Sequence, residues 1–331
     1  MTRPVLLLAS TLMLWIPPAA SVQADRYVAA DGTIRVAVVK QPIKGSRNVP
    51  ELSENPDYIA AGGGLADRLT EWGATLKPTA TARLTEAEQG DYGEWHRLGL
   101  ANGHLGDLVA ANEREGYFTV GLLANCNSLS GMLAGLQHSG PTRRPLRVGL
   151  VFIDAHGDYN TPETTLSGML GGMPVAVAAG HALTNIRMKS GLDPALPTSY
   201  IVMSCVRDAD PLEQERIDRS DIEMIPVDDI RSLSQNIHAQ MRRLSDTTDI
   251  IYIHIDMDVL DPSEVPGHPL TVPDGPTSLE LAAALEVMFQ YEKAAALGLA
   301  STPAGDADPD GRSRQAAYNL IEGALKGLRA R

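Results

Sequence analysis

The chain has 331 residues, 44% of them hydrophobic, and a formal net charge of −13 at pH 7. This length and apolar content are enough for a substantial buried core, in one large domain or two small ones. The acidic balance argues against a nucleic-acid partner, because proteins that bind DNA or RNA present basic surfaces.

The N-terminus has the pattern of a signal peptide. Arg3 precedes an unbroken run of apolar or small residues over 5–16, and Val22 and Ala24 stand at small-residue cleavage positions. The run is too short for a stable membrane-spanning helix. We therefore expect residues 1–24 to be removed. Residues 25–331 are then predicted to form a single exported domain, periplasmic or secreted, with no membrane anchor.

The rest of the chain alternates between expected strands and expected helices. Strands are expected over 34–40, 117–123, 147–153, 200–203, 223–227, 250–255 and 295–300. Helices are expected over 58–72, 95–115, 128–137 (with Ser128 as its N-cap), 211–217, 236–244, 279–291 and 314–328. Apolar strands separated by helices predict an α/β fold with a mainly parallel sheet covered on both faces. Ligands of such sheets bind beyond the carboxyl ends of the strands.

Two of the apolar strands end directly in side chains that bind metal ions. These are Asp154, His156 and Asp158 after one strand, and Asp256 and Asp258 after another. One such cluster alone is ambiguous, because aspartate after a strand is often a turn or helix-cap residue. Buried carboxylates repel each other and are costly to desolvate, so two clusters together indicate a multivalent cation. Oxygen ligands with imidazole suit Mn²⁺, and two ions about 3.5–4 Å apart would share carboxylates.

Three segments resemble motifs of the arginase (ureohydrolase) family. They are DAHGDYNTPETTLSG from Asp154, CVRDADP from Cys205 and HIDMDVLDPSEVPG from His254. The resemblance covers nearly all of residues 25–331. It implies a three-layer α/β/α domain with a mainly parallel central sheet, assembled as a homotrimer or hexamer.

The resemblance also implies two Mn²⁺ ions per subunit and a role for each ligand. Asp154 and Asp256 would bridge both ions. Asp158 would complete one ion and orient a bridging hydroxide, while His156 and Asp258 would complete the other. The hydroxide would attack the trigonal carbon of a guanidinium or amidine group.

The substrate-binding residues of the family have counterparts here too. The residues matching Asn160 and Ser167 hold the carboxylate of the substrate, and the residue matching Asp210 faces its amino group. An amino acid or a related small molecule is therefore the expected partner.

The sequence departs from the family at a metal ligand. The family segment GGDHS supplies a histidine ligand, but residues 124–128 here read ANCNS, which puts Asn127 at that position. An amide oxygen is a neutral, weaker ligand, whereas the thiol of Cys126 would favour a softer metal. Three alternatives are open: Asn127 binds, Cys126 binds, or neither does. A disulfide between Cys126 and Cys205 is a further alternative that the spacing leaves open.

Two catalytic side chains of the family are also replaced. Gly171 stands where the family has a proton-shuttling histidine, and His268 is a candidate replacement, unless it is a surface residue. Ala300 stands where a glutamate grips the guanidinium, and Glu163 or Asp306 are candidates to compensate. These changes argue against ordinary hydrolysis of L-arginine.

The expected function is therefore hydrolysis of linear C–N bonds in a guanidino- or amidino-type small molecule by a binuclear metal centre. The alternative is a catalytically inactive relative that binds a metal or ligand on the same fold. A zinc-dependent deacetylation of an acylated amine is a third class, which would need one zinc ion per chain.

Overall fold

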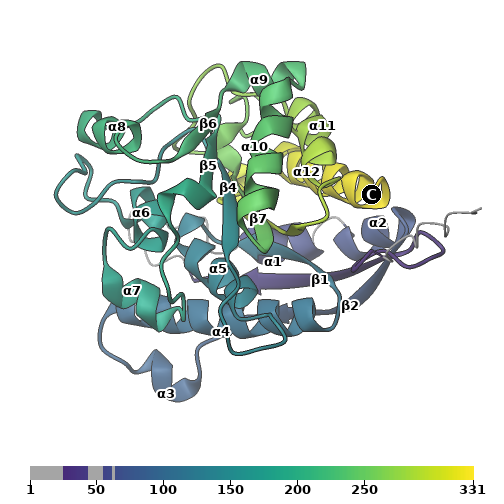
Figure 1. Cartoon of the computed structure of the whole chain (residues 1–331), viewed down its shortest axis with the longest axis horizontal. Helices are drawn as coiled ribbons and strands as arrows, with labels where there is room; N and C mark the ends of the chain where they lie inside the picture. Colours follow the sequence, from purple (N-terminus) through teal and green to yellow (C-terminus); the bar gives the residue numbers. More distant parts are fainter. Residues whose placement is uncertain (1–24, 44–54, 62–63) are drawn as a thin grey trace, which may run out of the picture.

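A computed structural model of the chain describes residues 25–43, 55–61 and 64–331 (Figure 1). Over these residues it contains one eight-stranded sheet in the order β2-β1-β3-β8-β7-β4-β5-β6, with every neighbouring pair parallel. The strands are β1 (Ile34–Gln41), β2 (Ala74–Thr81), β3 (Phe118–Leu123), β4 (Val148–Ile153), β5 (Ile201–Ser204), β6 (Glu223–Ile225), β7 (Ile250–Asp256) and β8 (Ala294–Ala300). The expected signal peptide, residues 1–24, lies outside the described residues.

Helices cover both faces of this sheet, so the predicted three-layer α/β/α architecture is confirmed (Figure 1). One layer consists of α4 (Glu94–Arg114), α5 (Leu129–Gln137), α6 (Pro174–Ala178) and α7 (Thr184–Lys189). The other consists of α1 (Asn55–Ala61), α9 (Val227–Ser232), α10 (Gln235–Thr247), α11 (Ser278–Met288) and α12 (Arg312–Arg329). Three short helices lie at the margins: α2 (Leu65–Glu71), α3 (Glu86–Gln89) and α8 (Pro211–Asp218).

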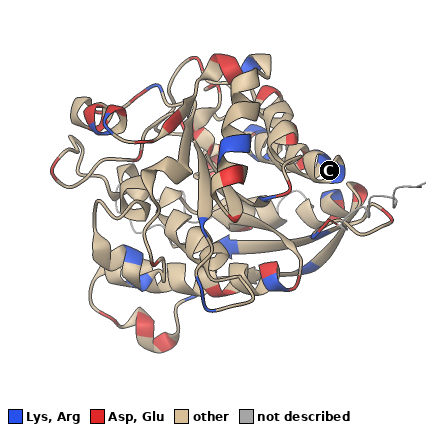
Figure 2. Cartoon of the chain, in the orientation of Figure 1, with Lys and Arg blue, Asp and Glu red and all other residues tan. Residues whose placement is uncertain are grey.

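The central strands carry the hydrophobic core. Every residue of β3, β4, β5, β7 and β8 is buried, as their continuous apolar sequences predict. The charged side chains lie mostly on the outer helices and loops (Figure 2). None of the described helices has both the length and the apolar composition that crossing a bilayer needs.

The strand β2 was not expected from the sequence, because it contains Pro78 and lacks an apolar run. All of its residues except Ala74 are at least partly exposed, and it pairs with β1 alone at the edge of the sheet. Proline is tolerated at such an edge because the missing N–H faces away from the ladder. The pairing with β1 is irregular between Ala37 and Val39, next to this proline.

Two expectations about helices were wrong in detail. The helix expected over 58–72 is divided into α1 and α2, and Gly64 at the start of α2 is left-handed with φ 68°. Ser128 precedes α5 but makes no capping hydrogen bond through its side chain. Asn125 takes that role instead, because its Oδ1 accepts the Asn127 backbone N–H at 3.1 Å and starts a short 3₁₀ turn over Cys126–Ser128.

The sheet order determines where the functional residues meet. The strands β3, β8, β7, β4 and β5 are consecutive neighbours. Because all are parallel, the segments that follow them emerge at one edge of the sheet, where α/β proteins bind their ligands.

Candidate metal centre

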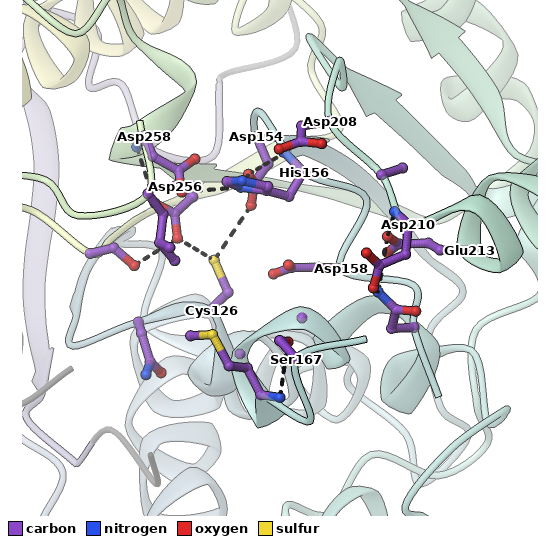
Figure 3. Close-up of a pocket in the computed structure, with 18 of the residues that line it drawn as sticks. Cys126, Asp154, His156, Asp158, Ser167, Asp208, Asp210, Glu213, Asp256 and Asp258 are labelled. Atoms are coloured by element: carbon purple, nitrogen blue, oxygen red, sulfur yellow. Dashed lines mark hydrogen bonds and ion pairs between the residues drawn. The ribbon is translucent and has the colours of Figure 1, made fainter. Parts of the chain in front are cut away.

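The residues that the sequence singled out converge on one cavity at the carboxyl edge of the sheet (Figure 3). Nine of them line it: Asp154, His156, Asp158, Asn160, Ser167, Asp210, Asp256, Asp258 and His268. They come from the segments after β4, β5 and β7. Asn127 does not line the cavity, and neither do Glu163 and Asp306.

The loop after β4 is folded so that its ligands face the cavity. Asp154 Oδ1 accepts the backbone N–H of His156 at 2.8 Å, which closes a tight turn. Asp158 then takes a left-handed backbone conformation with φ 48°, which is unfavourable for a residue other than glycine. Its backbone oxygen accepts the N–H of Val175 at 2.9 Å, so the start of α6 holds this conformation in place.

The end of β7 is organised around the carboxylate of Asp256. Its Oδ1 accepts the backbone N–H of Asp258 at 3.1 Å, so both side chains are held at the strand tip. Its Oδ2 accepts hydrogen bonds from the Ser301 hydroxyl at 2.6 Å and from the Cys126 thiol at 2.8 Å. Residues at or just after the ends of β3, β8 and β7 are therefore joined through this one carboxylate.

Ligand atoms of the cavity form three overlapping groups within the described part of the chain. These are Cys126 with Asp154 and Asp256, then Asp154 with His156 and Asp258, and finally Asp256 with Asp258 and His268. In each group the ligand atoms lie within 4.8 Å of one another. Asp154, Asp256 and Asp258 each belong to two groups, so they are placed to be shared by neighbouring ions. Asp158 faces the same cavity but belongs to none of the groups.

Two buried atoms of these groups lack a hydrogen-bond partner, and they test whether metal ions fit. They are Asp258 Oδ1 and His268 Nε2. Unpartnered polar atoms are costly in a protein interior and call for an explanation. A divalent cation in the groups that Asp258 joins would give its Oδ1 a partner and neutralise the carboxylates, and His268 Nε2 faces the same carboxylates. The residues present therefore fit bound metal ions.

The protonation of the cluster reflects its burial and crowding. Burial and the nearby Asp154 charge raise the pKa of Asp258 to about 6, against the opposing effect of His156. Burial alone would lower the pKa of His156, but hydrogen bonds to Asp154 and Asp258 outweigh it and raise this pKa to about 12. Burial also raises the pKa of Asp154, Asp158 and Asp256. Without a metal, protons supply the positive charge that the carboxylates need.

This protonation predicts how stability and metal binding depend on pH. Both the Asp258 and the His156 pKa lie above their unfolded values, so the metal-free folded state holds more protons than the unfolded state. Through these groups the metal-free protein loses stability as pH rises from about 4 to about 6, and again above about 6.5. Metal ions compete with the same protons, so affinity rises with pH.

We therefore expect Mn²⁺ to raise the melting temperature more at about pH 8 than at about pH 5.5, with protons released on binding. Calorimetric titration in buffers of different ionisation enthalpy measures that release. The variant Asp258→Asn should lose the part of the pH dependence that lies between about pH 4 and 6. An equal thermal shift at both pH values contradicts the prediction.

The structure favours Cys126 over Asn127 as the candidate metal ligand after β3. The sequence placed Asn127 at the family's histidine position, but the residue before it faces the carboxylates. Cys126 is buried, and its sulfur lies 2.8 Å from Asp256 Oδ2 and 3.9 Å from Asp154 Oδ2. The backbone oxygen of Asn127 accepts a hydrogen bond from the Asn102 side chain at 2.8 Å, which ties this residue toward α4. Both cysteines are free, so no disulfide joins Cys126 to Cys205.

His268 lies inside the cavity rather than on the surface. Its side chain is 1% exposed, and Nε2 is 3.7 Å from Asp256 Oδ1. Its Nδ1 accepts the Leu270 backbone N–H at 3.2 Å, so the neutral ring carries its proton on Nε2, the atom that faces the carboxylates. Gly171 also lines the cavity but offers no side chain.

The rim of the cavity carries the expected substrate-binding residues. Asn160 is fixed by its Nδ2, which donates to Asp210 Oδ2 at 3.1 Å and to Glu213 Oε2 at 3.0 Å. Ser167 is exposed at the mouth, where its hydroxyl accepts the Met169 N–H at 3.2 Å.

Sequence reasoning missed two rim carboxylates, Asp208 and Glu213. Glu213 is buried in the first turn of α8 and accepts the backbone N–H of Asp210 at 3.1 Å. The spacing from Asp210 to Glu213 is that of a capping box, which could have signalled it.

The guanidinium-binding position has no acidic replacement from the candidates named above. Ala300 is the last residue of β8 and is buried. Glu163 and Asp306 are both exposed and lie outside the cavity lining, so neither compensates. Ser301 lines the cavity instead, in a left-handed conformation with φ 61°.

Comparison with known proteins agrees with this geometry. A model of the Arginase family matches residues 130–324, more than half of the chain. The chain belongs to the arginase family.

Individual members of the family are similar to this chain at modest identity. The arginase of Bacillus caldovelox is 30% identical over 194 residues, which cover 58% of this chain and 63% of that protein. An N(omega)-hydroxy-L-arginine amidinohydrolase of Streptomyces lavendulae is 34% identical over 139 residues, 42% of this chain and 46% of that one. In both alignments the chain spans less than two thirds of the relative. The structure of the Bacillus subtilis arginase superposes with a TM-score of 0.75 at 23% identity, covering 88% of this chain and 98% of that one.

Proposed function

We propose that this arginase-family protein is a binuclear-metal hydrolase of linear C–N bonds in a guanidino- or amidino-type small molecule, with Mn²⁺ as its expected metal. The observation that carries the proposal is the sharing of Asp154, Asp256 and Asp258 among three ligand groups. Such sharing is what two adjacent ions require. Family membership supports a hydrolase acting on C–N bonds of linear amidines.

Asp154, His156, Asp256 and Asp258 would hold the divalent ions, which would lower the pKa of bound water and so supply a hydroxide near neutral pH. The protein's own residues orient the reactants around it. Asp158, held in its strained conformation, presents a carboxylate that accepts a hydrogen bond from the nucleophile. His268 presents an Nε2–H from the side of β7 and is placed to protonate the departing nitrogen.

The rim supports an amino acid or a related molecule as substrate. The Ser167 hydroxyl is placed to donate to a substrate carboxylate at the mouth of the cavity, while Asn160 donates both Nδ2 hydrogens to Asp210 and Glu213 and positions these carboxylates. Asp208, Asp210 and Glu213 give the same rim a negative field that favours a protonated amino group.

The head of the substrate is proposed to differ from the guanidinium of L-arginine. With Ala300 buried at the end of β8, a cationic head would lose the carboxylate partner that grips it in arginases, and an unpaired buried charge binds poorly. A similar relative is named for N(omega)-hydroxy-L-arginine, an arginine with a modified head.

A second candidate is a catalytically inactive relative that binds a metal or ligand. Gly171 and Ala300, which replace two reactive side chains of the family, favour it. The two candidates make different predictions about turnover but the same prediction about metal binding.

The test is a screen of the Mn²⁺-loaded protein against L-arginine, N(omega)-hydroxy-L-arginine and formimino and amidino compounds. Release of urea, ammonia or formamide is measured, with Asp154→Asn as the negative control. We expect turnover of at least one modified-head compound to exceed that of L-arginine. Tight metal binding with no turnover across the panel supports the inactive relative. L-Arginine as the best substrate contradicts the proposed head group.

The cellular setting belongs to the same proposal. The apolar run over 5–16 and the small residues before 25 support export to the periplasm or medium. Assembly into trimers or hexamers is proposed by analogy with the family alone.

A further inference from the structure

The side chain of Cys126 lies where a metal ligand would be expected. It is buried, and its sulfur belongs to a group of ligand atoms with Asp154 and Asp256. The same cavity holds the unpartnered Asp258 Oδ1, a buried carboxylate oxygen that independently calls for a cation nearby. The thiol is therefore part of a cluster of potential ligands and does not stand alone.

The turn after β3 aims this thiol into the cavity. Asn125 caps the 3₁₀ turn through the Asn127 N–H at 3.1 Å, and Asn102 holds the Asn127 backbone oxygen at 2.8 Å. These two hydrogen bonds fix the backbone on either side of Cys126. The sulfur then falls between the tips of β4 and β7 (Figure 3).

A buried chain of polar groups supports the sulfur from behind. His254 Nε2 lies 3.2 Å from Cys126 Sγ, and its Nδ1 lies 2.8 Å from the Tyr252 hydroxyl. If Tyr252 donates to Nδ1, then Nε2–H donates to sulfur. The hydroxyl hydrogen of Tyr252 and the ring hydrogen of His254 then each make one hydrogen bond. The sulfur accepts a hydrogen bond in this arrangement, as a thiolate does. Metal-bound side chains commonly have such a supporting partner.

The surrounding core is shaped to accommodate this chain of polar groups. His254 is fully buried and stacks on Phe152, with ring centroids 5.4 Å apart. Gly298 of β8 lies beside it, and a Cβ atom there would come within 1.9 Å of the Tyr252 hydroxyl. Buried polar networks of this kind are costly unless every member is satisfied. The hydrolysis proposed above uses neither His254 nor Tyr252, so the arrangement calls for another role.

We propose that Cys126 binds a divalent metal ion as a thiolate, together with Asp154 and Asp256, and that this position prefers Zn²⁺ to Mn²⁺. The Sγ–H bond breaks, an Sγ–metal bond forms, and the proton leaves to solvent with no change of oxidation state. Thiolate is a soft ligand that selects zinc-like ions, whereas carboxylates suit Mn²⁺. The neighbouring position at Asp154, His156 and Asp258 keeps a harder ligand set, so the two positions differ in metal preference. The inference rests on the proposed metal centre.

Cobalt spectroscopy of the full-length protein tests this proposal. Metal-free protein is titrated with Co²⁺, and the sulfur-to-cobalt charge-transfer band in the near ultraviolet is recorded. We expect the band in the wild type and its loss in Cys126→Ser. The matched control is Cys205→Ser, because Cys205 is equally buried and free but lies outside the cavity; it should keep the band. Cobalt bound to the wild type without the band overturns the proposal.

Metal competition gives a second readout. After dialysis against equal Zn²⁺ and Mn²⁺, the wild type should retain a higher ratio of zinc to manganese than Cys126→Ser, because the thiolate adds to the zinc preference of the site. The supporting variant His254→Phe should weaken zinc binding by roughly 10- to 100-fold. Circular dichroism checks that each variant is folded. Equal retention of zinc by wild type and Cys126→Ser overturns the proposal.

The outcomes separate this inference from the proposed hydrolase. The band without turnover upholds the thiolate ligand and counts against catalysis. Turnover without the band does the reverse.

Discussion

Replacing Asp256 with alanine is expected to remove metal binding and hydrolysis together. Asp256 is buried at the tip of β7 and belongs to two of the three ligand groups. No neighbouring carboxylate can take over both, because Asp154 and Asp258 are already engaged in their own groups. The loss should exceed the roughly 10- to 100-fold that a supporting residue costs.

Metal content per chain and turnover of the best substrate from the screen measure this effect. Asp256→Asn is the companion variant, because an amide can still accept hydrogen bonds from Ser301 and Cys126 while losing the charge. Asp228→Ala is the matched control, since that aspartate is 96% exposed on α9 and should change neither quantity. A variant at Asp256 that retains two metal ions and full turnover rules out the shared site.

The second large effect is expected for His268→Ala. This change should lower kcat by about 10²- to 10⁴-fold. The side chain is buried, and its Nε2 lacks a hydrogen-bond partner. With Gly171 at the family's histidine position, His268 is the histidine placed to donate a proton inside the cavity, apart from the candidate ligand His156.

The pH profile separates a proton donor from a metal ligand at this position. If His268 is the donor, His268→Ala loses one limb of the kcat profile and keeps its metal. If it is mainly a ligand, metal content falls with kcat. His238→Gln is the control, because that histidine pairs with Tyr291 away from the cavity. Unchanged kcat in His268→Ala eliminates both roles.

Much of the fold follows directly from the sequence. Continuous apolar runs such as those of β4 and β7 have few alternatives to buried strands, and the helices between them fix a parallel sheet. The edge strand β2 was missed because edge position, not apolar character, makes it a strand. In the sequence alone, Pro78 argues against a strand, and only the position of β2 at the sheet edge explains why a proline is tolerated there.

The candidate site was predictable where motifs are contiguous and not where contacts are distant. Two strand tips with alternating ligands placed Asp154 and Asp256 in one cavity, as expected. Whether Cys126 or Asn127 faces that cavity depends on a turn of three residues, which alignment to a motif does not resolve. His254 looked like a strand residue, and its contact with Cys126 spans 128 positions of the chain.

The order of strands in the sheet has a consequence for how the protein matures. The strand β8, near the end of the chain, lies between β3 and β7, so the sheet consists of two halves that pair with each other only through it. Pairing strands that are far apart in the sequence costs loop-closure entropy before the contacts form, and this slows folding. A chain still emerging from the ribosome therefore cannot close its sheet before residues 294–300 are made, and the carboxylates of β7 meet Ser301 only after that.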